Sequence, residues 1–179
     1  MPRYIALLRA INVGGRNIVK MDFLRRLFAS LGFSNVETFI ASGNVVFETT
    51  SKNAQAHERE IEKGLRQALG YEVTTFIRTV AELAAVANYK PFSRADLDGA
   101  AALNIAFLAE GLDAQTGEKL MALRTDIDDF HVHGREIYWL CRMRQSESRI
   151  SNAVLEKALG RKTTLRGVNT VRRMAAKYS

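Results

Sequence analysis

Apolar residues in the first 90 positions recur with periods that predict the element order β-α-β-β-α-β. Alternating or continuous apolar runs predict strands, and apolar residues three or four positions apart predict helices. Glycine follows both helical runs, where it suits a helix C-terminus, and Ser42–Gly43–Asn44 separates two β-rich runs as in a hairpin. The strands are predicted at residues 4–11, 36–41, 45–49 and 72–78, and the helices at residues 21–31 and 53–69.

The second half of the chain repeats this order after an intervening segment. Thr79 and Glu82 have the spacing of a capping box, which predicts a short helix that starts near Thr79. Residues 89–99, which contain Pro91, are the expected linker. Beyond it, strands are predicted at residues 103–109, 128–133, 136–140 and 163–166, and helices at residues 113–123, 151–159 and 169–177.

Matching residues in the two halves indicate an internal duplication. The offset between matched positions stays between about 90 and 100 residues, so the register is consistent along the chain. The matched pairs are residues 5–8 with 105–108, Gly43 with Gly134, Ala68–Leu69–Gly70 with Ala158–Leu159–Gly160, and Thr79–Val80 with Thr170–Val171.

We therefore predict an α+β fold made of two ferredoxin-like units, residues 1–90 and 100–179, packed together. Each unit is expected to hold an antiparallel four-stranded sheet with helices on one face. The first strand of each half is apolar on both of its faces, so the face without helices should be covered too, with the other half as the candidate cover. This pattern argues against an open sheet on which bases stack.

The net charge of +7 is concentrated at the C-terminal end. Residues 142–179 hold ten Lys/Arg and two acids, which gives +8, whereas the preceding residues hold 16 bases and 17 acids. This segment is either a solvated basic face or an anion-binding face for nucleic acid, phosphate or an acidic partner. The strand around Gly43 lacks the basic residue and the paired aromatics of an RNA-recognition motif. Nucleic-acid binding would thus fall to Arg142, Arg144, Arg166, Arg172 and Arg173.

Cysteine content and hydropathy bear on the compartment. Cys141 is the only cysteine, so the chain has no internal disulfide framework. No apolar run approaches the roughly 18 residues that span a bilayer, and the apolar run at the N-terminus is too short for a signal peptide. We expect a cytoplasmic protein that does not interact with membranes.

Polar and glycine-rich residues follow the first strand and form the turn of the first hairpin. In a β-α-β-β-α-β unit these two segments lie at the same edge of the sheet, so they should meet. Glycine lets a backbone approach a ligand closely, and backbone N–H groups at a helix start favour anions. The sequence predicts a pocket for a phosphate or carboxylate, although two ordinary tight turns would give the same pattern. Its expected residues are Asn12, Gly14, Gly15, Arg16, Ser42, Gly43 and Asn44.

Other reactive residues give weaker signals. His131 and His133 lie two apart on one strand and face the same way, as a metal pair would, but a third ligand is missing nearby, and we expect a His133–Glu136 pair instead. Cys141 follows an apolar run and is expected to be a buried hydrophobe. His57 lies on a polar helix and is expected to be solvated. We predict no metal and no cofactor, and no catalytic residue can be assigned.

Four motifs carry a family resemblance over nearly the whole chain: residues 4–15 followed by Met21, residues 42–47, residues 156–160 and residues 169–171. With these motifs the chain resembles the bacterial family called domain of unknown function 1697. Ala10 stands where that family usually has glycine, and residues 166–170 lack the tryptophan of its usual Arg-Asn-Trp-Asn-Thr run. The resemblance implies a duplicated ferredoxin-like fold and no particular activity, and it marks residues 12–15 and 42–44 as motif positions.

The leading hypothesis is a non-catalytic binding protein for a small anionic ligand at the edge formed by residues 12–16 and 42–44. One alternative is an enzyme that acts on a phosphorylated small molecule at the same edge, which would need a general base that the sequence does not supply. A second alternative is a nucleic-acid-binding module that uses the C-terminal arginines. A third is a purely structural protein that binds a partner, which an exposed apolar patch would indicate. The sequence leaves the oligomeric state and the choice between enzyme and binding protein open.

Overall fold

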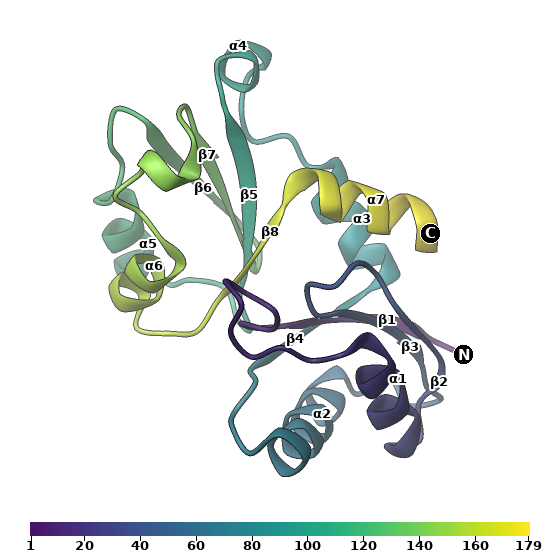
Figure 1. The fold of residues 1–179 in the computed structure, drawn as a ribbon. Coiled ribbons are helices and arrows are strands. Elements are labelled where there is room, and N and C mark those ends of the chain that lie inside the picture. Colours follow the sequence, from purple (N-terminus) through teal and green to yellow (C-terminus); the bar gives the residue numbers. More distant parts are fainter. The chain divides into compact units, whose positions relative to one another are not determined.

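A computed structural model describes residues 1–179, and Figure 1 shows the course of the chain. The chain divides into two compact units. Unit 1 consists of residues 1–84 together with 174–179, and unit 2 consists of residues 85–173. Each unit contains one antiparallel four-stranded sheet flanked by helices, which confirms the predicted α+β class and the two ferredoxin-like units.

Unit 1 has the predicted β-α-β-β-α-β order, and its sheet has the strand order β2-β3-β1-β4. The central strand β1 pairs antiparallel with β3 and with β4. The elements are β1 (Arg3–Leu8), α1 (Met21–Ser30), β2 (Ser34–Thr38), β3 (Asn44–Glu48), α2 (Ala54–Leu69) and β4 (Thr75–Thr79), followed by α3 (Val80–Asn88), which continues into unit 2.

Unit 2 repeats this order, and its sheet has the equivalent strand order β6-β7-β5-β8. The segment that we expected to be a linker contains a short helix, which begins where the Ser93 side chain accepts a hydrogen bond from the Asp96 amide. The elements are α4 (Arg94–Asp98), β5 (Ala102–Phe107), α5 (Ala114–Met121), β6 (Asp128–His133), β7 (Glu136–Cys141), the 3₁₀ turn η1 (Gln145–Glu147), α6 (Asn152–Leu159), β8 (Thr164–Gly167) and α7 (Val168–Tyr178), whose residues from Met174 onward belong to unit 1.

Local sequence signals explain the ends of the equivalent helices α2 and α6. Each begins after a polar side chain, Asn53 or Ser151, that accepts a hydrogen bond from an amide three residues on. Each ends at a glycine, Gly70 or Gly160, in the left-handed conformation that glycine adopts without steric cost. The predicted capping box is also present, because the amides and side chains of Thr79 and Glu82 bond reciprocally.

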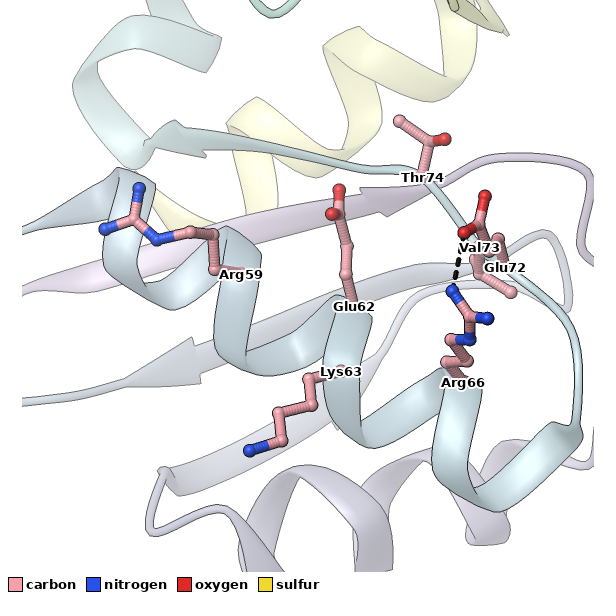
Figure 2. A pocket seen from close by; sticks show the side chains of 7 residues that line it. All are labelled: Arg59, Glu62, Lys63, Arg66, Glu72, Val73 and Thr74. Atoms are coloured by element: carbon pink, nitrogen blue, oxygen red, sulfur yellow. Dashed lines mark hydrogen bonds and ion pairs between the residues drawn. The ribbon is translucent and has the colours of Figure 1, made fainter.

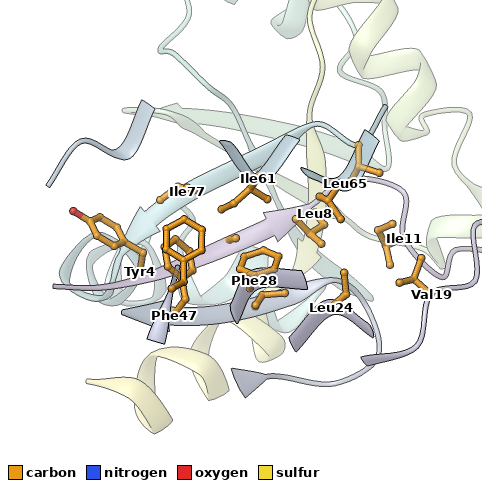
Figure 3. Packing of buried hydrophobic residues seen from close by; sticks show 14 residues of the cluster. Tyr4, Leu8, Ile11, Val19, Leu24, Phe28, Phe47, Ile61, Leu65 and Ile77 are labelled. Carbon is orange, nitrogen blue, oxygen red and sulfur yellow. The ribbon is translucent and has the colours of Figure 1, made fainter. Parts of the chain in front are cut away.

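The core of unit 1 lies between the sheet and the helices α1 and α2, as Figure 3 shows. Aromatic rings form its centre, where Phe33 and Phe47 lie 4.5 Å apart between centroids and Phe28 contacts both rings. Leu24 and Ile61 add buried aliphatic side chains from the two helices. Burial of this apolar surface supplies the main driving force for folding the unit.

The opposite face of each sheet is buried as well, as the apolar first strands led us to expect. Ile5 on β1 and Ile105 on β5 are fully buried there. The duplication also places an arginine at the equivalent position of the last strand of each unit. Arg78 on β4 pairs with Ile5 on β1, and Arg166 on β8 pairs with Ile105 on β5. Both arginines are buried. None of the helices has the length and apolar character needed to cross a membrane.

Candidate functional site

The loop after β1 and the β2–β3 turn meet at one edge of the first sheet, as predicted. The Leu8 amide donates to the Gly43 carbonyl at 2.8 Å, and the Asn12 side-chain amide donates to the Ala41 carbonyl at 3.0 Å. Gly43 has φ +77°, and a Cβ there would lie 3.1 Å from the Leu8 Cβ and 3.2 Å from the Ile11 Cβ. Glycine at this position lets the turn close against the end of β1.

The Asn12 side chain forms hydrogen bonds that hold the loop in its conformation. Its Nδ2 donates to the carbonyls of Val19 and Ala41, each at 3.0 Å, and its Oδ1 accepts from the Val19 amide at 2.7 Å. The side chain therefore ties the two ends of the loop to each other and to the neighbouring turn. These bonds use both donors of the amide, so a ligand would have to compete with them.

Asn44 and Ser42 are likewise part of the turn. Asn44 is fully buried, and its Nδ2 donates to the Phe39 carbonyl and to the Ser42 Oγ, both at 2.9 Å. A buried amide of this kind stabilises the turn because its polar atoms have partners. Of the seven predicted site residues, Asn12, Ser42, Gly43 and Asn44 thus contribute to the architecture of the edge.

The tip of the loop has a different character. The Arg16 amide donates to the Val13 carbonyl at 3.0 Å, and Gly14 and Gly15 between them have φ +58° and +74°, the pattern of a type I′ turn. The amides of both glycines are exposed and donate to no group of the chain. Apart from atoms of the adjoining residues, no atom lies within 4 Å of a Cβ placed at either glycine. The turn therefore projects into open space with two free donors.

Cationic side chains flank this tip. The side chains of Arg16 and Lys20 are exposed and make no hydrogen bond or ion pair within the chain. Residues 9–21 contain three bases and no acid, so the local charge is +3. Two consecutive free amides beside an unpaired guanidinium are suited to an anion.

Backbone conformations that L-residues rarely adopt concentrate at the same edge. Ala10, Asn12, Asn17 and Ile40 have φ between 50° and 59°, and the chain has only one further non-glycine residue of this kind, Asn35. Asparagine tolerates the left-handed region, whereas a β-branched residue such as Ile40 is strained there. Such strain persists only where surrounding contacts hold it in place, and it clusters at functional sites in proteins.

The C-terminal arginines are not equivalent to one another. Arg166 is buried, and its Nη1 donates to the Thr164 Oγ1 and the Leu165 carbonyl. Burial lowers the pKa of Arg166 to about 10, so it remains charged at neutral pH. Arg142 forms an ion pair with Asp96 at 3.5 Å. The remaining members of the proposed nucleic-acid set, Arg144, Arg172 and Arg173, have exposed side chains.

The paired histidines of β6 surround a tyrosine. The Tyr89 hydroxyl lies 2.8 Å from the His131 Nε2, and the Tyr89 ring stacks on His133 with centroids 3.7 Å apart. The two histidines do face the same way, and His133 pairs with Glu136 in the β6–β7 register. No cluster of three or more His, Cys, Asp or Glu side chains in the structure is placed to hold a metal ion.

The prediction for His57 was wrong, because the structure buries this side chain. It is 4% exposed, lies against the rings of Tyr4, Phe33 and Phe47, and its Nε2 bonds the Ser51 carbonyl at 3.1 Å. His57 is one helical turn from buried Ile61. That spacing was the signal that could have revealed its place on the inner face of α2.

Cys141 and Asp128 are buried, and both have a structural role. Cys141 is fully buried, and this burial raises the pKa of its thiol, so it lacks the character of a nucleophile. Asp128 is also buried and accepts hydrogen bonds from the Trp139 Nε1 at 2.9 Å and from the hydroxyls of Ser148 and Thr125. These bonds anchor the start of the β6–β7 hairpin to the segment after η1.

A hollow of about 360 Å³ lies between α2 and the chain that leads into β4, as Figure 2 shows. Arg66 and Glu72 in its lining form an ion pair at 2.7 Å, and the Glu62 carboxylate accepts from the Thr75 amide at 3.0 Å. Arg59 and Lys63 extend from α2 without partners in the chain. No sequence motif marks this hollow, and it is separate from the predicted edge.

Comparison with known proteins agrees with the fold described above. The strand order and the duplication define a double ferredoxin-like protein. The chain belongs to the family described as "Protein of unknown function (DUF1697)", whose sequence model matches residues 1–138. A conserved bacterial protein, SP0830 from Streptococcus pneumoniae, has a similar structure with a TM-score of 0.78 at 25% identity, covering 99% of this chain and 98% of that one. No curated protein matches the sequence.

Proposed function

We propose that the chain is a non-catalytic binding protein for a small anionic ligand, which it holds at the loop between β1 and α1. The observation that carries the proposal is the pair of consecutive amides, Gly14 and Gly15, which are exposed and donate to no group of the chain. Consecutive N–H groups in a turn form a concavity that binds anions. Arg16 adds a guanidinium that can bond a phosphate or carboxylate through two donors.

The ligand contacts in this proposal are fewer than the sequence suggested. Asn12 and Asn44 would hold the loop and the turn in place, while Gly14, Gly15 and Arg16 would touch the ligand. A scaffold of this kind keeps the two amides aimed in one direction before the ligand arrives. Preorganisation of this sort lowers the entropic cost of binding.

A binding role is favoured over catalysis by the composition of the edge. Residues 9–21 contain no histidine, cysteine or carboxylate that could act as a general base, and Asp22 is engaged by Arg25. The nucleic-acid alternative has less support, since Arg166 is buried and Arg142 is ion-paired. The single cysteine, buried and unpaired, suits the reducing cytoplasm in which we propose that the protein works.

Isothermal titration calorimetry with inorganic phosphate and with glucose 6-phosphate at low ionic strength tests the proposal. We expect saturable binding that Arg16→Gln weakens about fivefold, the effect of removing one exposed charge-assisted contact. Arg26→Gln is the matched control, because Arg26 is an exposed arginine of α1 without an ion pair. Absence of binding by both probes, or equal weakening by both substitutions, would contradict the proposal.

A further inference from the structure

A second hollow, with a volume of about 450 Å³, lies within unit 2. It forms where the end of α4 and the start of β5 meet the junction between β8 and α7. No acidic residue lines it. The lining residues are Leu97, Ala100, Ala101, Ala102, Leu103, Asn104, Gly167, Val168, Asn169 and Arg172.

Three polar side chains of this hollow have unused hydrogen-bonding groups. Asn169 and Arg172 lie three residues apart on α7, so they project from one side of its first turn. Neither side chain makes a hydrogen bond or ion pair within the chain. Asn104 donates from Nδ2 to the Gln145 Oε1 at 3.3 Å, while its Oδ1 has no donor. The hollow therefore presents one cation and two amides.

The remainder of the lining is apolar or small. Leu97, Leu103 and Val168 are partly buried there and offer hydrocarbon surface. Because Gly167 has no side chain, nothing from this residue covers the Asn104 Oδ1, which would lie 3.8 Å from a Cβ at this position. Pockets that bind small molecules typically combine apolar walls with a few convergent polar groups.

From this arrangement we infer a second binding site, for a small molecule that joins an anionic head, a carboxylate or phosphate, to a compact apolar body. The Arg172 guanidinium bonds the anion, the amides of Asn169 and Asn104 bond its polar substituents, and the apolar body lies on Leu97 and Leu103. This site does not depend on the loop between β1 and α1, because it is built entirely from residues of unit 2.

The test is a titration of ¹⁵N-labelled protein with benzoate and with phenyl phosphate, followed by ¹H–¹⁵N correlation spectra. We expect saturable shifts of the amide signals of Asn104, Gly167 and Asn169, and we expect Arg172→Gln to weaken binding about tenfold, as for loss of a charge-assisted contact in a pocket. The same spectra report whether each variant is folded. Benzyl alcohol, which lacks the anionic head, should bind at least about tenfold more weakly than benzoate.

The matched control is Arg149→Gln, which removes the same charge from an exposed arginine of unit 2 that does not line the hollow. It should leave the affinity for both probes unchanged. Three results would overturn the inference: no shift of the lining amides at millimolar probe, equal binding of benzoate and benzyl alcohol, or equal weakening by Arg149→Gln and Arg172→Gln. Shifts confined to Gly14 and Gly15 would support the loop site and refute this one.

Discussion

At the residue scale, glycine is needed for different reasons at Gly14 and Gly43. Both residues have positive φ, which costs an L-residue about 1–2 kcal/mol. Gly43 also lies against Leu8 and Ile11, where a side chain would be too close, whereas the space around Gly14 is open. The turn at Gly43 is thus fixed by packing, and the turn at Gly14 by backbone conformation alone.

This difference predicts unequal costs of the same substitution. Gly14→Ala should lower the free energy of unfolding by about 1–2 kcal/mol, from the backbone term alone. Gly43→Ala should lower the free energy of unfolding by about 1–3 kcal/mol more than Gly14→Ala does, because the end of β1 must shift to accept the methyl group. Urea denaturation followed by circular dichroism measures both. Equal losses would show that the close approach at Gly43 carries no energetic weight.

Asp128 is a buried carboxylate that organises the start of the β6–β7 hairpin through Trp139, Ser148 and Thr125. Its removal would leave the indole N–H of Trp139 buried without a partner. An unsatisfied buried donor costs about 1–3 kcal/mol, and bonds to a charged group contribute more than neutral ones.

We therefore predict that Asp128→Ala lowers the free energy of unfolding by about 2–4 kcal/mol. Trp139 is the only tryptophan, so urea denaturation followed by its fluorescence reports directly on this region. Asp126→Ala is the control, because Asp126 is exposed and has no bonded partner, and it should cost less than about 0.5 kcal/mol. A loss of the same size in both variants would refute the assigned role of Asp128.

Sequence reasoning predicted that the loop after β1 meets the β2–β3 turn, as it does in the structure, but it did not show which residues of this edge are bonded within the chain. Asparagine and glycine serve both purposes, since Asn12 and Asn44 can bond either a backbone carbonyl or a ligand. The structure shows that these side-chain amides donate to the backbone carbonyls of Val19, Ala41 and Phe39. Gly14 and Gly15 were selected because glycine lets a backbone approach a ligand closely; the structure leaves open space around both residues, and their contact with a ligand stays a prediction.

At the element scale, the edge strand β4 is shielded by its neighbouring helix. The amides of Thr75 and Ile77 face away from β1 and donate to the carboxylates of Glu62 and Glu58 on α2, at 3.0 and 3.1 Å. An edge strand with free amides can pair with a strand of another molecule. Two glutamates one helical turn apart thus accept hydrogen bonds from the backbone amides through which β4 could otherwise pair with another strand.

The shielding predicts a combined effect on stability and association. Replacing both Glu58 and Glu62 by alanine should lower the free energy of unfolding by about 1–3 kcal/mol, at about 0.5–1.5 kcal/mol for each bond. It should also produce concentration-dependent oligomers in light scattering after size exclusion. Glu60→Ala, on the exposed side of the same helix, should change neither quantity. A double variant with unchanged stability and unchanged self-association would contradict the account.

Helices and strands with a clear apolar periodicity or a capping residue were predictable from the sequence, and short helices were not. The strand pairs, α2 and α6 follow from alternation and from glycine at the helix ends. Helix α4 has only five residues and no apolar period, so its Ser93 cap was the single signal in a segment that contains Pro91. Tertiary contacts decide such short helices more than propensity does.

At the scale of the whole molecule, the duplication reproduced the architecture but not the loops. The two sheets have equivalent strand orders, and each carries a buried arginine on its last strand. The loop with Gly14 and Gly15 has no glycine pair at the equivalent place in unit 2, where residues 110–113 read Glu-Gly-Leu-Asp. Divergence of a loop on a repeated scaffold is expected where the loop has a function of its own.

The basic C-terminal segment carries +8, yet we predict weak affinity for nucleic acid. Arg166 is buried and Arg142 is ion-paired with Asp96, so two of the five arginines of the proposed nucleic-acid set are not available to replace counterions on a phosphate backbone. Fluorescence anisotropy with labelled single-stranded RNA and duplex DNA should show no saturable binding at physiological salt. Micromolar binding with a steep salt dependence, reduced in Arg172→Ala/Arg173→Ala, would establish the nucleic-acid alternative instead.

Anion binding at the loop between β1 and α1 is tested most directly by a titration of ¹⁵N-labelled protein with inorganic phosphate, read at the amide signals of Gly14 and Gly15. We predict saturable downfield shifts of these two signals, as expected when a free N–H begins to donate to an anion, and loss or marked weakening of the shifts in Arg16→Gln. Signals of Gly14 and Gly15 that stay unchanged up to millimolar phosphate and glucose 6-phosphate would contradict anion binding at this loop.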